Sequence, residues 1–434
     1  MHSEGITLYV TLDIGKNVHW FGAYEGAALN PVVEPFKVRS NQTGFEQISA
    51  ILEALLTSGD YRQVMLGHEP TGVYHEAWSR ALSRRYEPHL RGQRLPALSY
   101  QFVNPLLSSR KREELARGRP RKTDRVDLRA IAHCLRDGLG QPAFLPEPAC
   151  LRFQFWGKAW RRASREQRVL AAELLTQVDR LWPGAVVNLK RFSRMHPDLD
   201  IPAPLVSSRP LERQRLRVIL QHCPNPHDFL ALGPAGIRAF YRDHLGRCGP
   251  VTANLAFQWV SRAVLPPPPV AALLAEQLRF DFNRYRQVEQ RLADLATQVG
   301  DLIPDSPAAV LVTIPGVSPL LAARYLAHLG HPRRFVSAAE IWSFAGFDIN
   351  HRESGDSRHL GHITKMGNPG LRDTLYLIGL HTARHVPAIG LAKQRALANG
   401  KGRVGATLHA AHKANRLCHH LLFHQQPFDP NLSR

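Results

Sequence analysis

The chain has few cysteines and no apolar run long enough to cross a membrane. Its five cysteines, Cys134, Cys150, Cys223, Cys248 and Cys418, are scattered and form no CxxC pair. An odd, dispersed set argues against a disulfide framework and indicates a reducing compartment. The N-terminus, MHSEGITLYVTLDIG, lacks the charged and apolar regions of a signal peptide. We therefore expect a cytoplasmic protein that does not enter a membrane.

Acidic residues are too few to balance the basic ones. Among 434 residues, 56 are Lys or Arg and 36 are Asp or Glu, which leaves a net charge of +20. Such a charge attracts polyanions, of which nucleic acid is the commonest. A GC-rich genome, which favours arginine, is the alternative origin of the charge. The length indicates two to four domains, and 44% hydrophobic residues are enough to form their cores.

The first 140 residues alternate short apolar runs with amphipathic stretches. Four strands are predicted at LYVTLDIG, HWFGAY, PVVEPFKV and QVMLGHE. Helices are predicted at GFEQISAILEALL, YHEAWSRALSRR and TDRVDLRAIAHCLRDG, with Asn41 and Thr123 as N-caps of the first and last. Three strands, a helix, a strand and further helices is the order of an α/β ribonuclease H-like fold, although unrelated activities share that order. We expect this domain over residues 1–150.

The rest of the chain is predicted to be mainly α-helical. Two long amphipathic helices, at about 151–182 and 270–303, are expected to pair with each other. The segment between them is rich in proline and arginine and carries no chemistry that its sequence reveals. We therefore expect a helical region over 151–303 and a C-terminal domain over 304–434.

Four acidic residues stand where their side chains can converge. Asp13 ends the first strand and Glu69 ends the fourth, and these strands lie side by side in a ribonuclease H-like sheet. Asp124 and Asp127 are three positions apart near a helix start, so they share one face. Converging carboxylates repel one another unless a cation neutralises them, and Mg²⁺ or Mn²⁺ suits an all-oxygen site. The alternative is ordinary strand-end acids and an acidic pair favoured by the helix dipole alone.

The densest positive segment runs directly into this acidic pair, at SSRKREELARGRPRKTDRVDLR. Cations beside a metal site can hold the phosphates of a nucleic acid. A solvated charged face is the alternative. The candidate phosphate-binding residues are Arg110, Lys111, Arg112, Arg119, Arg121 and Lys122.

Two features of the C-terminal domain are also candidates for DNA chemistry. IPGVSPLLAARYLAHLG is typical of a helix-hairpin-helix, in which the turn at Gly316 presents backbone N–H groups to a phosphate; a plain helical hairpin is the alternative. Ser354 lies in a polar loop, RESGDS, ahead of Arg358, Lys365 and Arg372. A serine there could attack a phosphodiester while the cations stabilise the developing charge. Serine–glycine loops are common, so the loop alone indicates little.

Together these motifs resemble the DEDD-type transposases of the insertion sequence 110 family, which include bridge-RNA-guided recombinases. The matching pieces are LDIGK, GHEPTG, KTDRVDLRAIA, IPGVSPLLAARYLAHLG and the ESG…LGHITKMGNPGLR run. The resemblance covers about residues 6 to 140 and 305 to 385.

The resemblance implies a RuvC-like domain, a coiled-coil linker and a C-terminal transposase domain. It implies that Asp13, Glu69, Asp124 and Asp127 hold Mg²⁺, and that Ser354 forms a covalent phosphoserine link to DNA, with a companion metal site contributed by another subunit. It further implies dimers or tetramers that act on donor and target DNA at the nucleoid, and a noncoding guide RNA.

The chain also departs from the family, and other functions stay open. The family often has Ser-Ser-Gly where this chain has Glu353-Ser354-Gly355, and Ser357 is a rival nucleophile. A Holliday-junction resolvase that only hydrolyses would need the four acids but not Ser354. An actin-like sugar kinase would need a second Gly-rich phosphate loop, which the sequence lacks. A non-catalytic nucleic-acid-binding protein would tolerate alanine at the acids.

Overall fold

A computed structural model divides the chain into two compact units, Met1–Leu145 and Pro146–Arg434. A further boundary inside the second unit, expected near residue 303, stays a prediction. None of the described helices is long and apolar enough to span a bilayer. The structure describes residues 6–115, 123–200, 204–354 and 357–430, and for residues 350–354 and 357–362 it describes the backbone alone.

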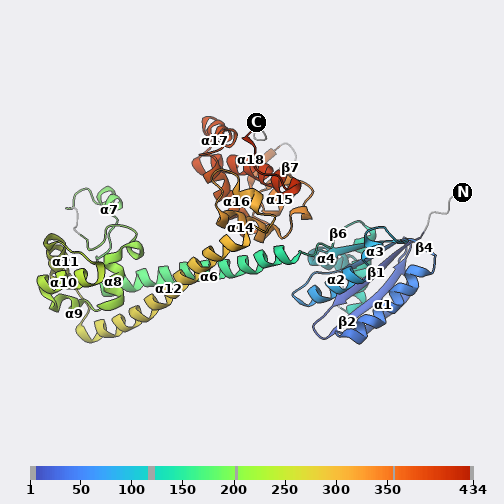
Figure 1. The fold of residues 1–434 in the computed structure, drawn as a ribbon, viewed down its shortest axis with the longest axis horizontal. Coiled ribbons are helices and arrows are strands. Elements are labelled where there is room, and N and C mark those ends of the chain that lie inside the picture. Colours follow the sequence, from blue (N-terminus) through green and yellow to red (C-terminus); the bar gives the residue numbers. More distant parts are fainter. Residues whose placement is uncertain (1–5, 116–122, 201–203, 355–356, 431–434) are drawn as a thin grey trace. The chain divides into compact units, whose positions relative to one another are not determined.

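The first unit is built on a six-stranded mixed sheet with the order β3-β2-β1-β4-β5-β6 (Figure 1). β1 is antiparallel to β2 and parallel to β4, and β4 is parallel to β5. The predicted α/β character of this part is therefore confirmed. Its elements are β1 Ile6–Ile14, β2 Val18–Glu25, β3 Asn30–Arg39, α1 Gln42–Thr57, β4 Tyr61–His68, α2 Tyr74–Arg85, α3 Glu87–Leu90, β5 Ala97–Val103, α4 Pro105–Leu115, α5 Asp124–Arg136 and β6 Gly140–Pro142.

Side chains of β1 alternate between two hydrophobic cores. Leu8, Val10 and Leu12 belong to the core that contains residues of α1 and α2, whereas Tyr9 belongs to the core that contains residues of α5. Because successive residues of a strand point to opposite faces, Asp13 shares the face of Tyr9. The end of β1 thus carries a carboxylate toward α5.

Both predicted helix caps are present. Asn41 Oδ1 accepts from the backbone N–H of Gly44 at 2.9 Å, and Thr123 Oγ1 accepts from the N–H of Val126 at 3.4 Å. Such caps satisfy N–H groups that have no partner within their own helix. The sequence patterns did not predict β5 or α4, which complete the sheet and its α5 side.

The second unit contains two long helices that run antiparallel and pack against each other, as Figure 1 shows. Trp156 Nε1 of α6 donates to the carbonyl of Leu295 in α12 at 2.8 Å, and Gln177 Nε2 donates to Asp281 Oδ2 at 2.7 Å. The predicted pairing of two long helices is therefore present. The helices are α6 Pro148–Leu181, α7 Leu189–Met195, α8 Gln214–His222, α9 Pro226–Ala231, α10 Gly233–Leu245, α11 Pro250–Arg262, α12 Pro268–Leu302, α13 Ala309–Val312, α14 Pro319–Leu329, α15 Ala338–Phe344, α16 Pro369–Thr382, α17 Pro387–Ala398 and α18 Arg403–His424.

Short helices α7 to α11 connect the two long ones. Their core includes Trp182, whose indole N–H donates to the carbonyl of Pro224 at 2.8 Å, and the buried rings of Phe229 and Tyr241. These aromatic residues belong to the same hydrophobic core as residues of α6 and α12, and α8 and α9 pack against α12.

The expectation of a loop around Ser354 needs correction. Two strands, β7 Ile349–Ser354 and β8 Ser357–Ile363, form an antiparallel hairpin in which Ser354 pairs with Ser357. The candidate serine therefore ends a strand. Gly355, next along the chain, lies outside the described residues.

Candidate metal centre and DNA-binding elements

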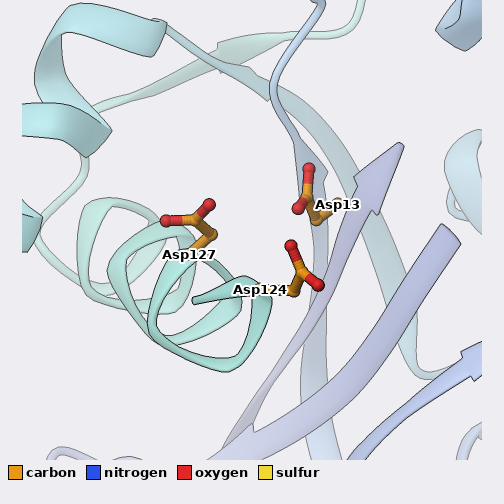
Figure 2. A group of neighbouring side chains, drawn as sticks. All are labelled: Asp13, Asp124 and Asp127. Carbon is orange, nitrogen blue, oxygen red and sulfur yellow. The ribbon is translucent and has the colours of Figure 1, made fainter. Parts of the chain in front are cut away.

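Three of the four predicted acids come together at the end of β1. One carboxylate oxygen each from Asp13, Asp124 and Asp127 lies within 4.8 Å of the others (Figure 2). Asp127 is buried, Asp13 is half-buried and Asp124 is exposed. The group therefore has a solvent-facing side and a protein-facing side.

The local fold explains why these acids meet. Asp124 and Asp127 lie in the first turn of α5, where the helix dipole favours negative charge. α5 approaches β4 closely because position 67 is glycine: a Cβ there would lie 2.7 Å from Leu135 Cδ2. Asp13 stands at the end of the neighbouring strand, on the same face.

The chemistry of this group fits a hard divalent cation. All three side chains offer carboxylate oxygens, the donors that Mg²⁺ and Mn²⁺ prefer. Three close carboxylates also repel one another, and a cation between them removes that cost. The donor set does not distinguish Mg²⁺ from Mn²⁺.

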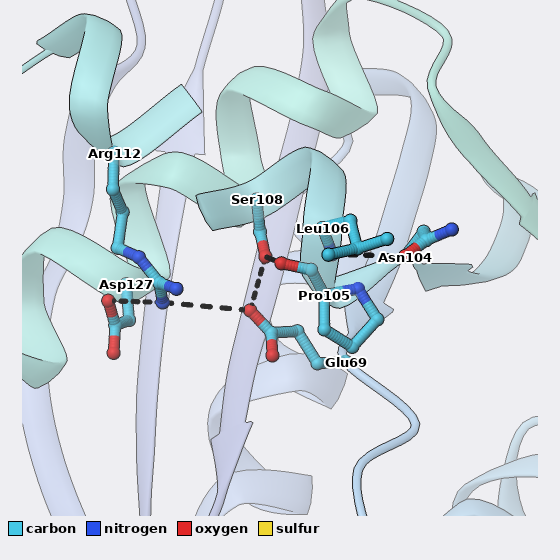
Figure 3. A network of polar contacts seen from close by, with 7 residues as sticks. All are labelled: Glu69, Asn104, Pro105, Leu106, Ser108, Arg112 and Asp127. Atoms are coloured by element: carbon cyan, nitrogen blue, oxygen red, sulfur yellow. Dashed lines mark hydrogen bonds and ion pairs between the residues drawn. The ribbon is translucent and has the colours of Figure 1, made fainter. Parts of the chain in front are cut away.

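Glu69, the fourth predicted acid, lies beside this group rather than in it. Ser108 Oγ donates to Glu69 Oε1 at 2.5 Å (Figure 3). Arg112 Nη1 donates to Asp127 Oδ1 at 2.8 Å and lies 3.8 Å from Glu69 Oε1. The guanidinium therefore stands between two of the acids and offsets their repulsion.

A buried histidine fixes the backbone at Glu69. His68 Nδ1 lies 2.9 Å from the carbonyl oxygen of Glu69 and therefore donates to it, while Nε2 lies 2.7 Å from Tyr100 Oη. Burial lowers the pKa of His68 to about 4, so the ring is neutral at pH 7. The neutral ring can donate at one nitrogen and accept at the other.

The predicted basic residues differ in their surroundings. Arg110 is exposed, and Lys111 forms ion pairs with Glu114 at 2.9 Å and Asp137 at 3.0 Å. The remaining candidates of the stretch, Arg119, Arg121 and Lys122, lie outside the described residues.

Sequence reasoning missed Ser108 and treated Arg112 only as a phosphate ligand. Both residues are on α4, four positions apart, and therefore on one face of that helix. The SSRKREEL run contains this spacing. Its many charged residues are typical of a solvated surface, so the sequence did not indicate a helix that faces the acids.

The turn before α14 requires its glycine. Gly316 has φ of +93°, and a Cβ there would lie 2.9 Å from His385 Cδ2 and 3.0 Å from the carbonyl oxygen of His381. The residue is exposed, and Ser318 caps α14 by accepting from the N–H of Leu321 at 3.3 Å. A phosphate contact at Gly316 stays a prediction.

The structure describes the surroundings of two of the three predicted cations near the serine hairpin, Lys365 and Arg372. Arg372 Nη1 donates to the carbonyl of Ala345 at 2.8 Å, and Lys365 has φ of +55°. Arg372 Nη1 also lies 3.4 Å from the carbonyl oxygen of Lys365, so Arg372 links the chain before the hairpin to the chain after it. Arg358 lies in β8, and its role, like that of Ser354, stays a prediction.

The comparisons with known proteins concern both units. Residues 308–393 match the family model described as transposase IS116/IS110/IS902 family. The mini-circle putative transposase for IS117 of Streptomyces coelicolor is 26% identical over 75% of this chain and 76% of its own length. The IS110 uncharacterized 43.6 kDa protein of the same organism is 33% identical over 28% of this chain and 30% of its own. A probable family 20 transposase of Pseudomonas aeruginosa is 28% identical over 28% of this chain and 35% of its own length. The chain is thus similar to transposases of the IS116/IS110/IS902 family, through residues 308–393 and through these relatives.

Proposed function

We propose that the protein is a DNA transposase that cuts and rejoins strands with a carboxylate-held metal ion and the hydroxyl of Ser354. The observation that carries the proposal is the meeting of Asp13, Asp124 and Asp127 within 4.8 Å at the end of β1. In this proposal Glu69, which directly follows the adjacent strand β4 and lies beside Arg112, adds a fourth carboxylate near the metal ion. The similarity to transposases supports DNA as the substrate class.

We also propose a RuvC-like, ribonuclease H-like identity for the first unit. The sheet order, with three antiparallel strands followed by parallel β4 and β5, supports it. The antiparallel α6 and α12 support the coiled-coil linker that the resemblance implies. Fold alone does not determine chemistry, so the acids and the serine carry the functional proposal.

Strand transfer through a serine conserves phosphodiester bonds. The Ser354 oxygen forms a bond to phosphorus while the strand oxygen leaves with the bonding electrons and takes up a proton. Attack by a new strand hydroxyl then breaks the serine–phosphate bond and returns a proton to Ser354. When bound, Mg²⁺ or Mn²⁺ supplies positive charge that stabilises the phosphoryl oxygens. No external energy source is needed because each bond broken is replaced.

Guidance by a noncoding RNA and assembly into dimers or tetramers are part of the same proposal. A net charge of +20 supports the binding of more than one polyanion. Paired DNA sites call for at least two copies of the serine.

A trapping assay tests the proposal. The full chain is incubated with Mg²⁺, labelled DNA carrying the element's ends and RNA from its flanks, then denatured and separated by gel. We expect a protein–DNA adduct that is lost in Ser354→Ala and in Asp13→Ala. Ser357→Ala is the matched control in the same hairpin and should retain the adduct.

Two other outcomes would assign different chemistry. An adduct that survives Ser354→Ala but not Ser357→Ala would make Ser357 the nucleophile. Cleavage without an adduct, unaffected by Ser354→Ala, would indicate a hydrolytic nuclease of the Holliday-junction-resolvase type.

A further inference from the structure

A cavity of about 970 Å³ lies among the short helices that connect α6 to α12. The sequence assigned no chemistry to this segment, and the proposed transposase reaction does not use it. Figure 1 shows α8, α10 and α11 grouped there. The lining residues are Leu205, Val206, Ser207, Arg213, Gln214, Arg215, Tyr241, Leu245, Arg247, Cys248, Gly249 and Thr252.

Two helices begin at the wall of this cavity. α8 starts after Arg213 and α11 starts after Gly249, and neither N-cap residue makes a side-chain capping hydrogen bond. The first N–H groups of a helix have no partner within the helix, and the dipole places partial positive charge there. Both helix ends therefore offer donors to an anion.

Three arginines add full positive charge to the same cavity. Arg213, Arg215 and Arg247 line it, and no acidic residue is among the described residues that do so. Arg213 is fixed by donating to the carbonyl and the hydroxyl of Ser208, each at 3.0 Å. Like charges held together without a neutralising partner favour an anionic ligand.

A buried hydroxyl provides an independent observation. Tyr241 is 1% exposed and lines the cavity, and its hydroxyl has no hydrogen-bond partner among the residues that the structure describes. A buried polar group without a partner is costly unless a ligand or water satisfies it. Burial raises the pKa of Tyr241, and the nearby Arg215 charge opposes that rise. The hydroxyl therefore stays protonated and can donate.

We propose that this cavity binds the phosphate groups of a nucleic-acid strand. Guanidinium groups, helix N-terminal N–H groups and a phenol are all donors, and phosphate oxygens are all acceptors. The cavity is far larger than one phosphate, so it has room for the adjoining sugar and base. The surrounding +20 chain draws in a polyanion rather than a small metabolite.

Cys248 gives a local reporter because it is half-buried and lines the cavity. The full-length chain is treated with a thiol-alkylating reagent, and modification of the Cys248 peptide is followed by mass spectrometry. The probes are a single-stranded oligonucleotide and, separately, inorganic phosphate. With oligonucleotide at about ten times its Kd, we expect roughly tenfold slower alkylation, since only the unoccupied fraction reacts.

The variants separate this cavity from the other basic surfaces. Arg215→Gln with Arg247→Gln should abolish the protection of Cys248, and Tyr241→Phe should weaken it while keeping the ring. Arg262→Gln, an exposed arginine of α11 outside the cavity, is the matched control and should leave the protection unchanged. Circular dichroism of each variant checks that it is folded.

Protection that persists in the double arginine variant would overturn the proposal. So would an oligonucleotide that binds the chain, as seen by fluorescence anisotropy, without slowing alkylation of Cys248. Protection by inorganic phosphate but not by the oligonucleotide would make the cavity a site for a free anion and would overturn the nucleic-acid assignment. None of these outcomes depends on the adduct assay for Ser354.

Discussion

Arg112 is the residue on which the electrostatics of the acidic group depend. Its guanidinium hydrogen-bonds Asp127 at 2.8 Å and lies 3.8 Å from Glu69, and all three side chains are at most 20% exposed. A cation in such a position stabilises neighbouring carboxylates more than a cation at the surface does, because water screens their interaction less. A metal ion would compete with Arg112 for the carboxylate oxygens of Asp127.

We predict that Arg112→Ala lowers the stability of the metal-free protein and tightens metal binding. Loss of the charged hydrogen bond leaves buried carboxylates without their partner, at a cost of about 1–3 kcal/mol. Removing a competitor for Asp127 should lower the Kd for Mn²⁺ by roughly tenfold, equivalent to about 1.4 kcal/mol. The measurements are urea unfolding without metal and isothermal titration with Mn²⁺.

Lys111→Ala is the control, because Lys111 is on the same helix but pairs with Glu114 and Asp137. Its affinity for Mn²⁺ should match that of the parent. Weaker Mn²⁺ binding by Arg112→Ala would show instead that Arg112 holds Asp127 in place for the metal.

At the scale of elements, α5 brings the acids together because it packs closely on the sheet. Leu128, Ile131 and Leu135 of α5 are buried in the same core as Tyr9 of β1. The contact with β4 depends on Gly67, because a Cβ there would lie 2.7 Å and 2.8 Å from the two terminal methyl carbons of Leu135. The sheet thus has a gap where the leucine fits.

We predict that Gly67→Ala destabilises the protein by about 1–3 kcal/mol through overpacking. The added methyl forces Leu135 to move, and α5 shifts with it, so the affinity for Mn²⁺ should also fall. The measurement is urea unfolding of Gly67→Ala, Leu135→Ala and the double variant.

The double variant supplies the control, because Leu135→Ala makes room for the new methyl. Its destabilisation should be smaller than the sum of the two single effects by at least about 0.5 kcal/mol. Additive effects would mean that the close approach at Gly67 has no energetic consequence.

How far the sequence predicts these elements depends on how local their signals are. The four predicted strands and the caps Asn41 and Thr123 follow from alternation and capping, which neighbouring residues determine. β5 carries the same alternation, with Leu98 and Tyr100 in the core and Phe102 packed against it, so its local signal was present although it was missed. α4 was missed because charge dominates its composition. Both are placed by contacts with distant parts of the chain.

The candidate sites also divide into features that the local sequence predicts and features that depend on distant contacts. Convergence of Asp13, Asp124 and Asp127 was predictable because strand ends and a helix start impose it. The position of Glu69 outside this group was not, because it depends on Ser108 and Arg112 of the missed α4. The arginine cavity was not predictable either, since its walls meet only when α8, α10 and α11 pack.

At the scale of the whole molecule, the two compact units have separate hydrophobic cores. Every residue of the two sheet cores lies within Met1–Leu145, and every residue of the helical core lies beyond it. A unit with its own core can fold alone at this size. The candidate metal ligands all belong to the first unit.

We therefore predict that a fragment of residues 1–145 folds by itself and binds Mn²⁺ with the affinity of the full chain. Circular dichroism should show one cooperative unfolding transition of the fragment in urea. The Tm of the fragment should rise when Mn²⁺ is added. The matched control is Asp13→Asn in the fragment, which keeps the shape of the side chain and removes one charge. Circular dichroism should show that this variant folds without metal, and its Tm should not rise with Mn²⁺. A fragment that folds but gains nothing from Mn²⁺ would refute the metal assignment, whereas an unfolded fragment would show that the first unit needs the second to form.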